Sequence, residues 1–341
     1  MNPSPRLTTA RPSNPDELNS ACIKLLQALK VGDGGFVAVV GAGPSSPMIP
    51  RGNDLIEEMR KACGLDDPTD IPFWDFYESA KEKNREEYCR LLKDKFNLTT
   101  YWRNDIYDNI CNIPFKTIIT TNYDHYLPKS FAMMEGPDWK KRFCVYPPRK
   151  DSDSDLSQPG MVYAIDFDHK KYLVAIHGYK DQKNEDWPLD SIILSKSDYM
   201  LHYFAGSKSQ FLYGWWKQVL SSHNCLFIGT SLLEPGIGKA LLDLGTSGAF
   251  ERQPRQHLQL IDASLSETEI NGVKQPPSYP EPRVLYDAVQ QVQFDPKNSF
   301  EGLLDVLSNI SGKYTYNDFE PGMTAPTFPS LDSLNASHVT Q

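Results

Sequence analysis

The sequence predicts an α/β fold, a doubly wound parallel sheet with a helical insertion. Two observations point to this class. Five short segments are continuously apolar and rich in β-branched residues, which is typical of strands buried on both faces of a parallel sheet. Amphipathic helical patterns lie between them, and strand and helix alternate in this way in doubly wound folds. The predicted strands cover Phe36–Val40, Thr117–Thr121, Tyr172–Ile176, Cys225–Gly229 and His257–Ile261.

Helices are predicted before the first strand and between the strands. The first, Asn14–Leu29, has Pro15 at an early position and a broad apolar face. Four further segments carry apolar residues at helix-like spacing with charged residues between them. These segments are Leu55–Cys63, Phe73–Phe96, Leu201–Leu220 and Gly236–Leu244.

The chain is predicted to form one domain with two polar ends rather than two separate cores. An acidic, Ser-rich segment at 151–160 and a Pro-rich segment at 275–282 are expected to be exposed loops. The C-terminal end has few aliphatic residues, so we expect it to be flexible or ordered only against a partner. The predicted parts are a flexible arm at 1–16, the domain at 17–313 with helical elaborations at about 55–112 and 197–222, and the tail at 314–341.

The composition excludes several classes of protein. With 35 basic and 44 acidic residues the net charge is −9, which argues against direct nucleic-acid binding. A hydrophobic content of 40% is enough for a large core. No window approaches 18 uninterrupted apolar residues, and the segment Met1–Asn19 is polar. We therefore expect no membrane segment and a cytoplasmic location.

The six cysteines are widely scattered along the chain. The closest two, Cys89 and Cys111, are 111 − 89 = 22 positions apart, so no CxxC or zinc-knuckle spacing exists. Scattered thiols in an intracellular chain are typically small buried apolar side chains. No metal site is therefore expected.

Functional residues are expected just beyond the strands, because ligands of an open parallel sheet bind outside the carboxyl ends of its strands. The first strand is followed by Gly41–Ser45, with the sequence Gly-Ala-Gly-Pro-Ser. Its glycines would let the backbone approach a bound pyrophosphate, and the following amides would point at the pyrophosphate oxygens. A plain structural turn is the alternative interpretation.

Polar residues also follow the second and third predicted strands. The second strand runs into Asn122 and Asp124, which either face a ligand or cap the next helix. The third runs into His177 and Gly178. This histidine either faces a ligand, with room left by the glycine, or is a structural histidine with its hydrogen bonds satisfied.

The last two strand ends complete the pattern. Gly229–Leu232 has hydroxyl groups that could contact a ribose or phosphate. Asp262 could bind a pair of ribose hydroxyls, as acidic residues do in dinucleotide-binding folds. Each signal is ordinary alone, but their order along one chain, each at a strand end, favours a nucleotide site.

This ordered set of motifs resembles the sirtuin (SIR2) superfamily, in which a GAG-x-S loop, a T-x-N-x-D segment, an HG pair and a GTSL turn build the NAD site. The resemblance covers about residues 35–262, and Phe300–Ile310 fits the usual closing helix. It implies a Rossmann-like fold with NAD as the substrate. The matching residues are Gly41–Ser45, Thr120–Asp124 with Asn122 in the asparagine position, His177-Gly178 and Gly229–Leu232.

The departures from the protein deacetylases of the superfamily indicate a different branch. The two cysteine pairs that hold a structural zinc are absent, and Met48–Asp54 stands where those enzymes carry a GIPDFR-like segment. Tyr123 and the aromatic region Tyr199–Trp216 look instead like the SIR2-like NAD hydrolases of bacterial anti-phage systems. The resemblance thus implies an NAD glycohydrolase that releases nicotinamide and ADP-ribose and acts in abortive infection. The alternatives are an NAD-dependent protein deacylase and a non-catalytic sensor of NAD or ADP-ribose.

The resemblance also implies a role for each residue at the strand ends. His177 would be the general base, and Asn122 would hold the ribose or position the attacking water. The other implied NAD-binding residues are Gly41, Ala42, Gly43 and Ser45 at the pyrophosphate, Thr121 and Asp124 in the asparagine segment, Gly229, Thr230 and Ser231 at a phosphate or ribose, and Asp262 at the adenosine ribose.

Partners are implied because a free NAD hydrolase would be toxic to its own cell. The resemblance implies control by homo-oligomerisation or by a co-encoded activator, such as a HerA-like ATPase or a phage-sensing subunit. The aromatic side chains between Tyr199 and Trp216 would pack in the core, cover the NAD pocket or form a subunit interface.

Overall fold

A computed structural model describes most of the central part of the chain. The predicted helix Asn14–Leu29, both polar ends and the loops at 151–160 and 275–282 lie outside the described residues, and of Phe300–Ile310 only Leu307 is described, in a helical conformation. The described residues are 36–45, 49, 52–65, 71–96, 105–113, 115–147, 171–179, 192–204, 211–230, 232, 234–248, 257–262, 289–294 and 307.

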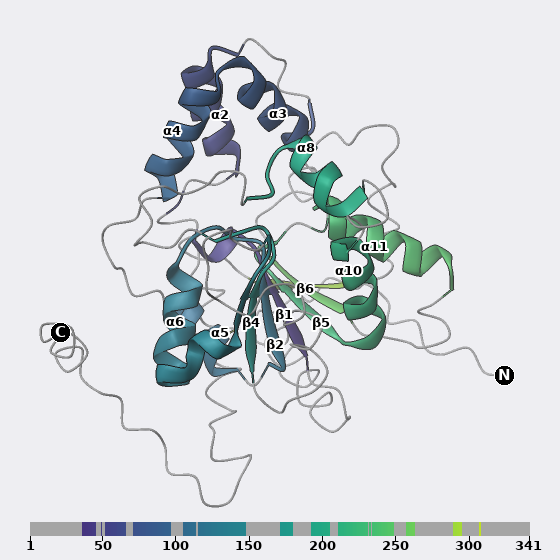
Figure 1. The fold of residues 1–341 in the computed structure, drawn as a ribbon. Helices are drawn as coiled ribbons and strands as arrows, with labels where there is room; N and C mark the ends of the chain where they lie inside the picture. The colour runs from purple at the N-terminus through teal and green to yellow at the C-terminus, as the bar shows by residue number, and fades with distance from the viewer. Residues whose placement is uncertain are drawn as a thin grey trace, which may run out of the picture.

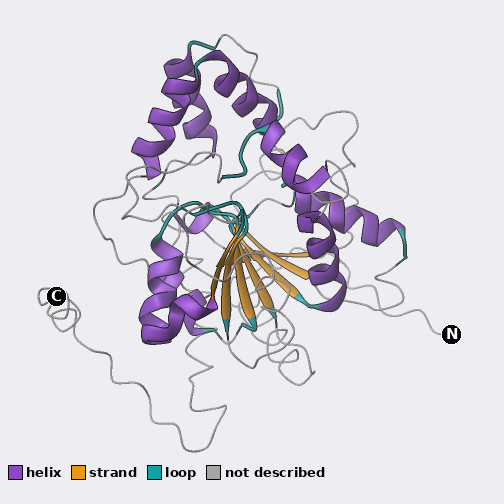
Figure 2. Cartoon of the chain, viewed as in Figure 1, coloured by secondary structure: helices purple, strands orange, loops and turns teal. Residues whose placement is uncertain are grey.

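The core of the fold is a seven-stranded sheet in the order β3-β4-β2-β1-β5-β6-β7. Every neighbouring pair is parallel, and helices flank the fan of strands on both sides (Figure 2). The predicted α/β class with a Rossmann-like parallel sheet is therefore confirmed. The strands are β1 Val37–Val40, β2 Thr117–Thr120, β3 Phe143–Val145, β4 Tyr172–Ala175, β5 Cys225–Ile228, β6 His257–Asp262 and β7 Val289–Phe294.

All five predicted strands are present, and the two that were not predicted, β3 and β7, lie at the two edges of the sheet. An edge strand has only one hydrogen-bonded neighbour and need not be apolar throughout. In β7 the sequence Val-Gln-Gln-Val-Gln-Phe mixes polar and apolar residues, and β3 has only three residues. β7 therefore lacks the continuous apolar run that predicts the central strands, and the apolar run of β3 is too short to predict a strand.

The central strands end level with one another, which brings the residues that follow them together. Val40 at the end of β1 pairs with Thr120 of β2 and with Ile228 of β5. Thr120 pairs in turn with Ala175 at the end of β4. The loops after these four strands therefore start at the same edge of the sheet.

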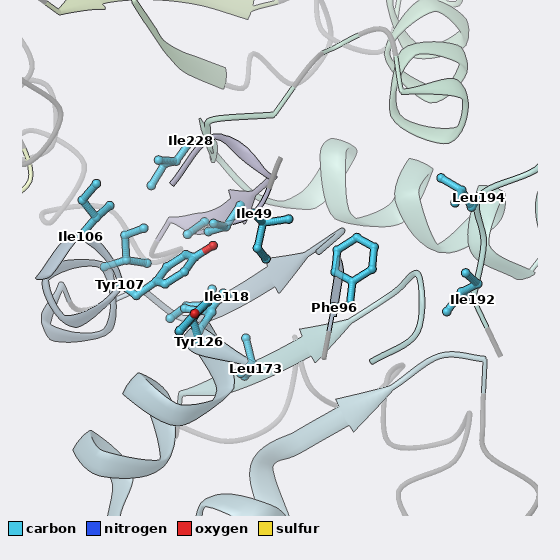
Figure 3. Close-up of a cluster of buried hydrophobic side chains, with 14 of the residues drawn as sticks. Ile49, Phe96, Ile106, Tyr107, Ile118, Tyr126, Leu173, Ile192, Leu194 and Ile228 are labelled. Carbon is cyan, nitrogen blue, oxygen red and sulfur yellow. The ribbon is translucent and has the colours of Figure 1, made fainter. Parts of the chain in front are cut away.

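Successive residues of the central strands point to opposite faces, and each face has its own core. Ala38, Val40 and Ile118 belong to one cluster of buried side chains, part of which is shown in Figure 3. Val37 and Val39 belong to the cluster on the other face. The first cluster includes side chains of the helical segments 52–63, 73–83, 85–96, 105–112 and 126–135, and the second includes those of the segments 196–199, 211–222 and 235–246.

The helices divide into two groups by position. Helices α2, α3 and α4 lie beyond one end of the strands, whereas α5, α6, α10 and α11 flank the sheet (Figure 1). Their bounds are α2 Gly52–Cys63, α3 Phe73–Lys83, α4 Arg85–Phe96, α5 Asp105–Asn112, α6 Tyr126–Glu135, the 3₁₀ segment η2 Gly136–Arg142, α8 Lys196–Tyr199, the π-helical turn η4 Met200–Phe204, α10 Phe211–Ser222 and α11 Pro235–Thr246.

One predicted helix proves to be interrupted. The pattern Phe73–Phe96 forms two helices that meet at Asn84, whose backbone is extended. The Asn84 amide donates to the carbonyl of Ala80 at the end of α3, and its side-chain oxygen accepts from the amide of Glu87 in α4. One asparagine thus ends one helix and caps the next, a role its side chain favours.

The described residues also contain neither a membrane-spanning helix nor a metal-binding cluster. None of the described helices is both long and apolar enough to cross a bilayer. In the same residues no three His, Cys, Asp or Glu side chains are arranged to hold a metal ion. The five described cysteines are free thiols, and Cys22 lies outside the described residues.

Candidate functional site

A cavity of about 380 Å³ lies between the carboxyl ends of the central strands and the helices α2 and α3. Its size is typical of a site for a small-molecule ligand. The strand ends supply a polar wall, and the helices with adjoining segments supply an apolar one. The polar wall includes Ser45, Thr121, Asn122, Asp124, His177, Thr230 and Glu234, and the apolar wall includes Ile49, Leu55, Ile56, Phe73, Trp74, Phe96 and Leu194.

The glycines of the first loop serve a contact between two loops. A Cβ atom on Gly41 would lie 2.5 Å from the carbonyl oxygen of Gly229, and one on Gly43 would lie 2.7 Å from the Gly229 Cα. The amides of Gly41 and Gly43 donate to the carbonyls of Ile228 and Gly229 at 3.0 and 2.9 Å. These two glycines are therefore required by the packing of the loop after β1 against the loop after β5, whatever ligand is bound.

The position of this loop also limits how it could hold a pyrophosphate. The Ser45 amide donates to the Ala42 carbonyl, and Pro44 has no N–H. Three of the loop's amides, those of Gly41, Gly43 and Ser45, thus already have protein acceptors. Gly41, Ala42 and Ser45 line the cavity, and Ala42 is exposed. A ligand would therefore meet the exposed Ala42 and the side chain of Ser45 rather than a full cradle of amides.

Asn122 is held by a buried chain of hydrogen bonds. Its Nδ2 donates to the Gly41 carbonyl at 2.8 Å and to the Tyr107 hydroxyl at 3.0 Å. Ser45 Oγ donates to Asp124 Oδ2 at 2.9 Å, so the hydrogen bond between Ser45 and Tyr107 has the Tyr107 hydroxyl as its donor. Both protons of the Asn122 amide are thereby directed into the protein. Its Oδ1 is the side-chain atom that can accept a hydrogen bond from a ligand.

Asp124 accepts hydrogen bonds from the start of α6 and from the first loop, so it joins the two segments. Its Oδ1 accepts from the amide of Tyr126 at the start of α6, and its Oδ2 accepts from Ser45. Burial raises the pKa of the Asp124 carboxyl from 3.8 to about 6, and the hydrogen bonds from Tyr126 and Ser45 only partly offset this. Asp124 also lines the cavity, so a ligand would meet this carboxyl group.

The raised pKa of Asp124 predicts a pH dependence of stability. Because its folded-state pKa of about 6 lies above the ordinary value of 3.8, the folded chain binds the proton more tightly than the unfolded chain. The contribution of Asp124 is therefore fully favourable below about pH 4 and is lost as the pH rises through 6, at a cost on the order of 3 kcal/mol. Urea unfolding at several pH values should show this decline in the wild type and a flatter curve for Asp124→Asn.

The matched control for this experiment is Asp94→Asn, which also removes one carboxyl group but from an exposed ion pair with Arg90. The Asp124→Asn variant would also lose one of the two hydrogen bonds that the carboxylate accepts, and this changes the absolute free energy of unfolding. The comparison therefore uses the slope of the unfolding free energy against pH. Parallel curves for the wild type and Asp124→Asn would show that Asp124 is not protonated preferentially in the folded state.

His177 follows β4 directly and is almost completely buried, with 2% of its surface exposed. Its Nε2 lies 2.9 Å from the Tyr203 hydroxyl and 3.4 Å from Glu234 Oε1. The ring also meets the edge of Tyr199 at 5.6 Å between centroids. Gly178 has a φ of 92°, so the turn after His177 adopts a backbone that favours glycine. His177 lines the cavity opposite the first loop.

The structure describes only some of the remaining predicted site residues. Thr121, Gly229 and Thr230 line the cavity, and the Thr230 carbonyl accepts from Gln259 Nε2 at 3.0 Å. Ser231 lies outside the described residues, and of Asp262 the backbone at the end of β6 is described but not the side chain.

Several residues that line the cavity or contact its lining were not predicted as site residues. Glu234 follows the Gly229–Leu232 motif by two positions and precedes Pro235, a helix-start signal that could have directed attention to it. Tyr123 stands inside the asparagine motif, and its hydroxyl donates to the Ile193 carbonyl at 2.7 Å. Tyr107 carries no sequence signal at all, because it lies on α5, away from any strand end.

The aromatic segment considered in the sequence serves mainly as core. Tyr203, Trp215 and Trp216 are buried in the cluster formed with α10 and α11. Tyr199 is buried and also lines the cavity, where it meets Trp74 edge-on at 5.7 Å between ring centroids. The segment therefore both packs in the core and forms part of the cavity wall.

A parallel sheet with a glycine-containing turn after β1 and a cavity with polar side chains at its strand ends is typical of nucleotide-binding α/β proteins. A family model described as a SIR2-like domain matches residues 116–275 of the chain. This match supports membership of the SIR2-like superfamily and a sirtuin-type function related to NAD. The matched segment includes Asn122 and His177. A search of curated proteins found no match to the chain.

Proposed function

We propose that this protein is an NAD glycohydrolase that cleaves NAD into nicotinamide and ADP-ribose. The observation that carries the proposal is the meeting of Asn122 and His177 in one cavity, from the ends of the neighbouring strands β2 and β4. Both residues are buried, at 6% and 2% exposure. An amide acceptor and an imidazole in one cavity can orient and deprotonate a hydroxyl group or water.

The proposed reaction makes modest demands on the protein. The bond between C1′ of the ribose and the nicotinamide nitrogen breaks, and its electron pair leaves with nicotinamide, which becomes neutral. The resulting ribosyl cation is attacked by water, whose oxygen forms the new bond to C1′ while its proton leaves to a base. Positioning of the water and stabilisation of the cation therefore account for most of the catalysis required of the protein.

The residues at the cavity support a separate role for each of them in this reaction. His177 would accept the proton of water or of a ribose hydroxyl. Asn122 would use its Oδ1 as a hydrogen-bond acceptor for the ribose or the water, because its Nδ2 is committed to Gly41 and Tyr107. Ser45, Thr121, Asp124, Gly229 and Thr230 would contact the rest of the nucleotide from the other strand ends.

The aromatic wall supports the same assignment. Phe73, Trp74 and Tyr199 contribute flat rings at the cavity, and Phe96 adds a fourth. Aromatic rings bind other planar rings by offset or edge contacts. A nicotinamide or adenine ring would find such a surface next to the polar strand ends.

A biological role follows from the same proposal. We propose that the enzyme depletes the cytoplasmic NAD pool in anti-phage defence, and that oligomerisation or a co-encoded activator switches it on. This part rests on the resemblance to the SIR2-like NAD hydrolases of such systems. Expression of the wild type with its neighbouring genes during phage infection should lower cellular NAD, whereas uninfected cells should keep theirs.

The enzymatic proposal is tested by chromatography of NAD incubated with the purified full chain. Conversion to nicotinamide and ADP-ribose without any peptide is the expected result. A parallel incubation with an acetylated lysine peptide separates the alternative of a protein deacylase, for which nicotinamide release depends on the peptide. Intact NAD in every incubation, including those with the co-encoded proteins, would contradict the proposal and favour a binding module.

A further inference from the structure

Glu234 places a carboxylate beside His177 that the roles described so far do not use. It stands at the N-cap of α11, where its Oε2 accepts from the amide of Ile237 at 2.7 Å. Its other oxygen, Oε1, is buried and has no hydrogen-bond partner among the described residues. The residue is 8% exposed and lines the cavity. A helix cap needs only one carboxylate oxygen, so Oε1 requires a separate explanation.

The polar atom that explains it is His177 Nε2, which lies 3.4 Å from Oε1. An ionised carboxylate is only an acceptor, whereas an imidazole nitrogen is either a donor or an acceptor. A lone pair on Nε2 would face the negative oxygen unfavourably, while an Nε2–H group would be attracted to it. The arrangement therefore favours the proton of the neutral ring on Nε2.

The other groups around His177 are consistent with this placement. The Tyr203 hydroxyl, at 2.9 Å from Nε2, can accept a hydrogen bond as readily as it can donate one. The ring of Tyr199 meets the imidazole edge-on. His202, on the same π-helical turn as Tyr203, is a charged neighbour only when protonated, and burial lowers its pKa. Glu234 is thus the one group of these that selects the tautomer.

We propose that Glu234 is a positioning residue for His177, holding the imidazole proton on Nε2 so that Nδ1 is the nitrogen that accepts a proton. When Nδ1 takes a proton from water or a ribose hydroxyl, the positive charge of the ring faces the carboxylate. The pair works as the base and its orienting acid do in nucleophilic catalysis. Its importance for turnover rests on the proposed NAD hydrolysis, whereas the tautomer itself does not.

The decisive variant is Glu234→Gln. Its side-chain oxygen can still accept from the Ile237 amide, so the helix cap and the side-chain size remain. Its NH₂ group then faces His177 Nε2 as a donor, which favours the opposite tautomer with the proton on Nδ1. We expect kcat for NAD to fall by roughly 10²-fold or more, with KM little changed, because the base is lost and not the binding surface.

The tautomer is measured directly by long-range ¹H–¹⁵N NMR of the ¹⁵N-labelled full chain. The chain has seven histidines, and the His177 signals are those that disappear in His177→Asn. The expected result is an Nε2–H tautomer in the wild type and an Nδ1–H tautomer in Glu234→Gln. Glu57→Gln is the control, because it also exchanges one glutamate for glutamine, but in an exposed pair with Arg60.

The two readouts separate this inference from the proposed function. An unchanged His177 tautomer in Glu234→Gln would overturn the inference, even if the wild type hydrolyses NAD. A switched tautomer in Glu234→Gln, together with a wild type that leaves NAD intact, would support the pairing and contradict NAD hydrolysis. A switched tautomer with unchanged kcat would overturn the role of Glu234 in turnover.

Discussion

Replacing His177 by alanine is expected to lower kcat/KM for NAD by roughly 10²–10⁴, the usual contribution of a general base. The reason is that His177 is the imidazole found among the residues that line the cavity at the strand ends. Its backbone should stay in place, since the His177 carbonyl still accepts from the Ile193 amide at 3.1 Å. The measurement is the rate of nicotinamide release under initial-rate conditions.

The matched control for this variant is His223→Ala. His223 is similarly buried, at 6% exposure, but it precedes β5 and so lies at the opposite end of the strands from the cavity. Both variants lose a buried ring, so both lose some stability, and only His177→Ala should lose turnover. Equal rates in the two variants, each still folded by circular dichroism, would remove His177 from the proposed chemistry.

The second large effect concerns the contact between the two loops at the cavity. Gly229 has a φ of 58°, and a Cβ there would lie 2.4 Å from Pro44 Cδ and 2.9 Å from Gly43 Cα. Gly229→Ala should lower the free energy of unfolding by about 2–5 kcal/mol, the sum of two costs. A left-handed backbone costs a residue with a Cβ about 1–2 kcal/mol, and forcing a methyl group into a packed contact costs about 1–3 kcal/mol more.

Gly64→Ala separates these two costs. Gly64 has a similar φ of 66°, but nothing lies within 4 Å of the position its Cβ would take. Its substitution should therefore show the backbone cost of about 1–2 kcal/mol alone. Urea unfolding of both variants gives the comparison. Equal losses would mean that the two loops can move apart at no cost, and that the contact does not shape the cavity.

The central strands of the fold could be predicted because their environment is visible in their own residues. A strand covered on both faces must be apolar throughout, as Val37–Val40 and Cys225–Ile228 are. The edge strand β7 mixes polar and apolar residues and β3 has only three residues, so the same pattern does not identify them. Likewise, the break at Asn84 depends on a local capping bond that the helical spacing on either side conceals.

In the candidate site, too, some features could be predicted from the sequence and others could not. Residues directly after the strands, such as Asn122 and His177, were predicted because parallel strands in register bring their carboxyl ends together. Their order in the sequence therefore determined that they would meet. Which atoms they present was not determined, because that depends on hydrogen bonds to Tyr107 and contact with Glu234.

The sequence by itself determined the parallel sheet, its central strands and the polar edge at which a nucleotide would bind. Only the tertiary structure decided that Gly41 and Gly43 serve a contact between loops, that Tyr107 orients Asn122, and that Glu234 lies beside His177. The physical reason is the range of the interactions. Strand burial and pairing follow from short local patterns, whereas these contacts join segments that the chain brings together only when its helices pack on the sheet.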